Sequence, residues 1–144
     1  VLDDGDVTPL VTALTDPLVA TLGANGVALL DATQTFTKAQ RGDVIALADG
    51  ATITPNFASG NNFSITLGGN RTLANPTNLA EGQSGVIAVT QDGTGTRLLA
   101  FDTYWKFANG ATPTLSTGPG MVDYLTYYVE TAARVFVSVV KDVS

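Results

Sequence analysis

Three aspartates, Asp92, Asp102 and Asp123, are the residues best suited to catalysis or metal binding. Two carboxylates held about 5–9.5 Å apart could hydrolyse a glycosidic bond, and a cluster of carboxylates could bind Ca²⁺. The segment at residues 92–95 reads Asp-Gly-Thr-Gly, which lacks the alternating acidic spacing of a calcium loop. Asp92 is therefore expected to form a turn, and Asp123 to fix the start of a strand. We expect no catalytic residue, no bound metal and no cofactor.

The composition excludes several classes of active and binding site. The chain has no histidine and no cysteine, so Ser-His-Asp and Cys-His catalysis and thiolate metal sites are ruled out. The net charge is −6 with only 7 Lys and Arg, so there is no basic face for nucleic acid or an anionic membrane surface. No apolar run approaches the roughly 20 residues that span a bilayer, so membrane insertion is not expected.

Four residues could instead form a binding site for a glycan or host receptor. Asn70 and Arg71 follow a Gly-Gly turn, Asn78 lies in a nearby Asn-Pro-Thr-Asn segment, and Trp105 could offer an aromatic platform. Each also has a structural interpretation. Asparagine caps turns, Arg71 could pair with a carboxylate across a sheet, and tryptophan in a small β-domain is commonly core or subunit interface.

Short alternating segments predict β-strands from about residue 39 onward. Residues 62–67 alternate apolar and polar side chains, the period of a half-buried antiparallel strand. Residues 91–95 predict a hairpin between strands at 85–90 and 97–101, because Asp-Gly accepts positive φ. Residues 134–140 are apolar at nearly every position, so both faces of this strand are expected to be covered. Further strands are expected at 44–47, 51–57, 71–73 and 121–129.

These elements predict an all-β fold, namely an antiparallel, jelly-roll-like β-sandwich with a short irregular or helical N-terminal segment. No internal repeat is recognised in the sequence. We divide the chain into an N-terminal attachment and oligomerisation segment, residues 1–37, and a β-sandwich domain, residues 38–144. An apolar stripe of roughly helical spacing in the first segment is expected to contact other copies of the chain: Leu10, Leu14, Leu18 and Leu22.

The surface is expected to be poor in charge. Charged residues make up 14% of the chain, against about 25% in an average soluble domain, while hydrophobic residues make up 44%. Part of such a surface could be covered by a partner, most simply by copies of the same chain. The alternative is a neutral surface rich in Thr, Ser and Asn.

An ordered series of short motifs resembles the β-rich C-terminal module of tailed-phage virion proteins of the tail fibre, head fibre and decoration type. The resemblance covers about residues 33–144, and its motifs are TFTKAQRG at 35–42, NNF at 61–63, LGGNRTL at 67–73, NPTN at 75–78, GQSG at 82–85, QDGTG at 91–95, WKF at 105–107, PTLST at 113–117, VD at 122–123 and YYV at 127–129.

This resemblance implies a compact β-sandwich, often trimeric, displayed on the exterior of the particle. It supplies no catalytic residues. It leads us to expect a non-enzymatic exterior fibre, spike or decoration subunit that assembles as a homotrimer and contacts other virion proteins through its N-terminal segment. The alternative is a carbohydrate- or host-receptor-binding module with a host surface glycan as its partner.

Overall fold

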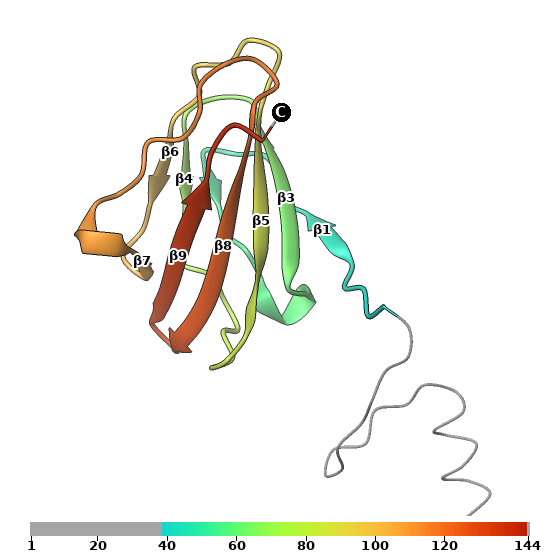
Figure 1. Cartoon of the computed structure of the whole chain (residues 1–144), viewed down its shortest axis with the longest axis vertical. Coiled ribbons are helices and arrows are strands. Elements are labelled where there is room, and N and C mark those ends of the chain that lie inside the picture. The colour runs from blue at the N-terminus through green and yellow to red at the C-terminus, as the bar shows by residue number, and fades with distance from the viewer. Residues whose placement is uncertain (1–38, 144) are drawn as a thin grey trace, which may run out of the picture. The chain divides into compact units, whose positions relative to one another are not determined.

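The computed structural model describes residues 39–143, which are almost entirely strands and turns (Figure 1). The chain separates into two units, Val1–Gln40 and Arg41–Ser144, and the fold below is that of the second. The predicted division at residue 37, and the stripe Leu10, Leu14, Leu18 and Leu22, concern the first unit and lie outside the described residues. The elements are β1 (Val44–Ala46), β2 (Thr52–Ile53), η1 (Phe57–Ser59), β3 (Asn62–Leu67), β4 (Arg71–Leu73), β5 (Ser84–Gln91), β6 (Leu99–Phe101), β7 (Trp105–Phe107), η2 (Ala108–Gly110), β8 (Val122–Thr131) and β9 (Arg134–Val140).

The strands form two sheets. The large sheet has six strands in the order β1-β3-β5-β8-β9-β7, and the small sheet has three in the order β2-β4-β6. Figure 1 shows the small sheet lying behind the large one. The all-β class predicted from the sequence is therefore confirmed.

The first six strands wind three times between the two sheets. The chain passes from β1 to β2, from β3 to β4 and from β5 to β6, each time crossing from the large sheet to the small one. β1, β3 and β5 consequently pair in parallel, as do β2, β4 and β6. A parallel pair needs a crossover connection, and here a strand of the other sheet takes the place of the usual helix. β8 and β9 then add an antiparallel hairpin to β5.

This winding differs from the predicted antiparallel pairing, and a jelly roll is not confirmed. Residues 62–67 form a strand as expected, but both of its neighbours, β1 and β5, run parallel to it. The turn at residues 91–95 does not close a hairpin, because β5 and β6 belong to different sheets. The positive φ angles of this turn lie at Gly95 (69°) and Thr96 (63°) and not at Asp92 or Gly93, and the chain leads across the core and not back along the same sheet.

One apolar core lies between the two sheets. The large sheet contributes Phe63, Ile87 and Leu125, which sit on paired neighbouring strands and are 0–1% exposed. The small sheet contributes Ile53 and Leu73, which are register partners on β2 and β4. Phe57 of η1 stacks on Phe63 and Tyr127, with ring centroids 5.5 and 4.6 Å apart. No helix among residues 39–143 is long and apolar enough to cross a membrane.

Candidate functional surface

The most unusual feature of the described chain is the outer face of the large sheet, the face turned away from the small sheet. Side chains alternate along each strand, so the neighbours of the core residues point outward. The register aligns these outward residues in rows across β1, β3, β5, β8 and β9. We call them the outer face: Val44, Ala46, Asn62, Ser64, Val86, Ala88, Tyr124, Thr126, Tyr128, Phe136, Ser138 and Val140.

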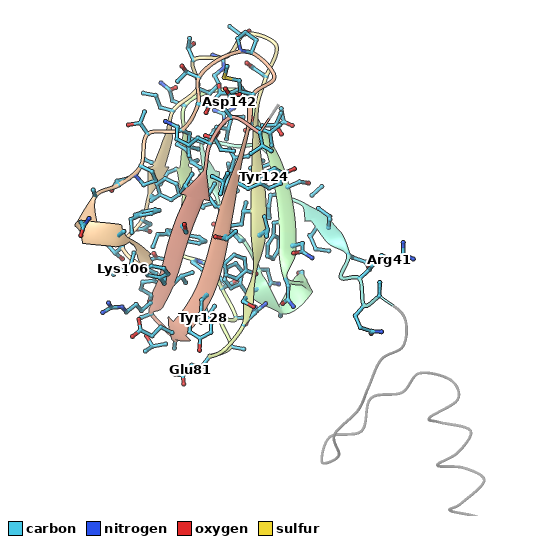
Figure 2. All side chains as sticks on the ribbon, in the orientation of Figure 1. Arg41, Glu81, Lys106, Tyr124, Tyr128 and Asp142 are labelled. Atoms are coloured by element: carbon cyan, nitrogen blue, oxygen red, sulfur yellow. The ribbon has the colours of Figure 1, made fainter. Side chains whose placement is uncertain are left out.

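Large apolar side chains on this face are exposed. Val44 is 63% exposed, Val140 54%, Tyr128 50% and Phe136 48%. Tyr128 faces Phe136, and Tyr124 faces Val140, as direct cross-strand partners of β8 and β9. Figure 2 shows Tyr124 and Tyr128 on the same side of β8. Cross-strand aromatic and β-branched pairs of this kind stabilise a sheet, and they also form a contiguous apolar surface.

Charged side chains lie at the borders of the outer face and not within it. Glu130 and Arg134 form an ion pair of 2.7 Å where β8 turns into β9. Lys106 lies on the edge strand β7, where its Nζ donates to the Thr103 carbonyl at 2.6 Å. An apolar centre with a polar rim is the usual anatomy of a protein–protein interface.

A shallow hollow extends across the outer face from β1 to β9. Its volume is about 650 Å³, and it is lined by Val44, Asn62, Phe63, Val86, Ala88, Tyr124, Thr126, Val140 and Val143. Small side chains on β5 form part of the hollow. The Tyr128–Phe136 pair is not among the residues that line it.

Two buried polar residues fasten the long connection between β7 and β8 to the sheets. Gln91 is 3% exposed; its Nε2 donates to the carbonyls of Arg97 and Ser116, both at 2.9 Å, and its Oε1 accepts from the Arg97 N–H at 2.9 Å. Asp123 is 2% exposed, and its two oxygens accept from the backbone N–H of Ser116 at 2.6 Å and of Asp142 at 2.8 Å. Asp123 therefore holds the start of β8, as predicted, together with the segment that follows β9.

The other aspartates also act on the local backbone. Oδ1 of Asp92 accepts from the N–H groups of Thr94 and Gly95, so Asp92 forms the predicted turn. Its Oδ2 accepts from Nε and Nη2 of Arg97 at 3.0 and 2.8 Å, and the Arg97 hydrogen bond is the main reason that the pKa of Asp92 lies below its usual value. Asp102 accepts from the N–H of Thr103. Among the described residues, no three carboxylates gather as metal ligands.

The four residues predicted to contact a glycan or receptor do not form one site. Asn70 accepts from the Leu98 N–H at 3.0 Å at the start of the small sheet. Arg71 makes a bidentate ion pair with Asp49, in which Nε and Nη2 donate to the two carboxylate oxygens at 2.8 and 2.6 Å. The side-chain hydrogen bonding from Arg71 is the main cause that lowers the pKa of Asp49. Asn78 lies in the connection that follows the other end of β4, and donates to Asn56 at 2.8 Å.

Trp105 is 4% exposed, and its indole N–H donates to the Ala74 carbonyl at 3.0 Å. Its ring meets Phe57 and Phe101 edge-on. The structure thus places Trp105 in the core, where its ring is not accessible to a sugar.

The sequence prediction missed the outer face as a site. One signal was present, since residues 134–140 alternate Val135, Val137 and Val139 with Phe136, Ser138 and Val140. That pattern predicts cover on both faces of the strand. In the described chain Val135 and Val137 are buried, whereas Phe136 and Val140 are about half exposed. The prediction of cover on both faces is therefore wrong for the single chain.

Comparison with known proteins identifies one family. A family model described as "Putative phage tail fibre C-terminal domain" matches residues 53–127, which run from the end of β2 to the middle of β8. No curated protein matches the chain. No solved structure matches it either.

Proposed function

Because the chain belongs to the phage tail fibre C-terminal domain family, and is thus a structural component of a phage virion, we propose that it is an exterior, non-enzymatic fibre subunit that assembles as a homotrimer. The family match over residues 53–127 is the observation that carries this proposal. The matched region contains most of the parallel winding and half of β8, so it includes most of the core residues, although Val129, Val135 and Val137 lie beyond it.

The mechanism is non-covalent. The three windings and the β8–β9 hairpin share one apolar core, and the outer face serves as the contact surface. Its carboxylates Asp92, Asp102 and Asp123 serve turns and strand ends, which fits a scaffold better than a catalyst. The low content of charged residues, 14%, supports assembly through apolar surface.

Two functional expectations from the sequence remain predictions. The N-terminal segment, residues 1–37, is proposed to join the subunit to other virion proteins and to contribute Leu10, Leu14, Leu18 and Leu22 to the oligomer. Contact with a host surface glycan is the alternative function. The separate positions of Asn70, Arg71 and Asn78, and the burial of Trp105, give it no single site among these residues.

Native mass spectrometry of the full 144-residue chain tests the proposal. A homotrimer gives a mass three times the 14.8 kDa of one chain, at micromolar concentration and at physiological salt. A species of 14.8 kDa at every concentration would overturn the homotrimer. A glycan array probed with the same material tests the alternative function. If the chain binds a glycan and an Arg71→Ala variant binds it equally well, Arg71 does not have the predicted role in glycan contact.

A further inference from the structure

The outer face of the large sheet is uncovered in one chain although it carries large apolar side chains. Valine and aromatic residues lie on both faces of β8 and β9, mixed on the outer face with Thr126 and Ser138, but only the inward set has a covering layer. Monomeric proteins rarely expose contiguous apolar patches larger than a few hundred Å² without using them. We infer that this face is the surface through which copies of this chain pack against one another, an inference that rests on the proposed assembly and names its contact surface.

The size of the face limits how much of such a contact it can supply. Five strands about 4.8 Å apart span roughly 19 Å, and the outward rows on β5 and β8 extend over roughly 20 Å, which gives about 400 Å² of projected area. In a ring of three copies each face is shared between two neighbours, so one contact buries about 400 Å² of outer face in total, against the roughly 1,200–2,000 Å² of a specific protein interface. Surface beside the outer face must therefore contribute to each contact as well.

The charge distribution favours a copy of the same chain as the occupant. The net charge of −6 makes whole chains repel one another, so a self-contact must use a surface without carboxylates. On the outer face the only carboxylate of β8 is Glu130, at the border, where it is neutralised by Arg134. The centre, formed by Val86, Ala88 and Thr126, has no charged side chain.

The shape of the face points to contacts between unlike parts of it. The Tyr128–Phe136 pair lies on β8 and β9 and does not line the 650 Å³ hollow, which extends from β1 to β9 and is lined on β8 by Tyr124 and Thr126. A contact between one part of a copy and a different part of the next copy is heterologous, and such contacts form a ring when the rotation between copies closes and an open filament when it does not. A trimer is one such ring, with the aromatic pair of each copy directed toward the hollow of its neighbour.

Thiol labelling tests this directly, because the chain contains no cysteine. Tyr128→Cys reports on the outer face, and Leu98→Cys is the matched control, since the two parent side chains are 50% and 53% exposed and Leu98 lies outside the large sheet. In the assembled 144-residue chain, a maleimide is expected to react at least about tenfold more slowly at position 128 than at position 98, because a buried thiol reacts only when the contact opens. Equal rates in an assembled protein would overturn the inference.

A charge insertion gives a second readout. Phe136→Lys places an ammonium group in the proposed contact, whereas Leu98→Lys places one at a similar apolar position elsewhere. Circular dichroism should show both variants folded, because both positions are about half exposed. Phe136→Lys is expected to dissociate at a protein concentration at least about tenfold higher than the parent chain, and Leu98→Lys at the same concentration as the parent.

The outcomes separate this inference from the proposed function. A parent chain that is monomeric at all concentrations removes the homotrimer and this inference together. The parent chain could instead be trimeric, with fast labelling at position 128 and unchanged assembly of the Phe136→Lys variant. The homotrimer would then form through another surface, and the outer face would be overturned as its contact.

Discussion

Both faces of the large sheet carry large apolar side chains, but those on one face are buried and those on the other are exposed. Inward, Phe63, Ile87 and Val135 are no more than 1% exposed, because the small sheet and the η1 segment cover them. Outward, Phe136 and Val140, on the same strand as Val135, remain about half exposed. The difference shows what the pattern of apolar residues along a strand can indicate. It identifies the side chains that a second layer would bury, but it does not indicate whether that layer belongs to the same chain or to another one.

The largest expected effect comes from comparing a phenylalanine-to-alanine substitution on the inner face with one on the outer face. Phe63→Ala on the inner face should lower the free energy of unfolding by about 3–5 kcal/mol, because it removes a fully buried ring and leaves a cavity beside Phe57. Phe136→Ala on the outer face should lower it by about 1 kcal/mol or less in the dissociated chain. Urea denaturation of both variants measures these values.

Measuring the stability of Phe63→Ala and Phe136→Ala at several protein concentrations separates the two faces further. Assembly adds to the apparent stability of a folded chain, and the addition grows with concentration. The deficit of Phe136→Ala should therefore increase with protein concentration, whereas that of Phe63→Ala should stay nearly constant. If both deficits were large and independent of concentration, the two faces would not differ in the way described.

How far the sequence predicts this fold depends on whether the signal is local. The bounds of β3 and β9 were predicted as observed, because alternation within a strand is a local property. The expected strand at 51–57 ends at Ile53, since Pro55 cannot donate to a ladder and Asn56 caps η1 by accepting from the Ala58 N–H.

Strand pairing was not predictable from the same pattern. Alternation in residues 62–67 is compatible with parallel or antiparallel neighbours, and the direction depends on crossovers through the other sheet. The three windings escaped notice as a repeat because their spacings are unequal: Val44 pairs with Asn62, and Asn62 with the more distant Val86. The outer face was missed for a related reason, since cover by a second chain leaves the same pattern as cover by the same chain.

The second prediction concerns the one charged residue on the inner face of β8. Asp123→Asn keeps the shape of the side chain, but replaces one acceptor oxygen by an NH₂ group that faces the N–H of Ser116 or Asp142. A buried donor left without an acceptor should lower the free energy of unfolding by about 2 kcal/mol. Thermal or urea denaturation measures it, with Asp102→Asn as a control in an exposed turn. Equal losses in the two variants would contradict the structural role given to Asp123.

The smallest expected effect distinguishes two adjacent tyrosines on opposite faces. The Tyr127 hydroxyl donates to the Asn61 carbonyl at 2.8 Å, and burial raises the pKa of Tyr127 from 10.0 to about 12. Its neutral form is favoured in the folded state, so the stability that it contributes is fully present below about pH 10 and is lost as the pH rises through about 12. Tyr127→Phe should lower the free energy of unfolding by about 1 kcal/mol at neutral pH and flatten its decline at alkaline pH.

Tyr128→Phe is the matched control for this variant, because it removes the same hydroxyl from the next residue on the outer face. Its ring is half exposed, so the stability of the dissociated chain at neutral pH should change by less than about 0.5 kcal/mol. The alkaline decline that Tyr127 causes should remain in this variant. Urea denaturation at a series of pH values between 8 and about 12 compares the two directly, at a concentration low enough to avoid assembly. A flattened decline in Tyr128→Phe and an unchanged one in Tyr127→Phe would mean that the inner and outer positions of β8 are exchanged, and the register that defines both faces would have to be wrong.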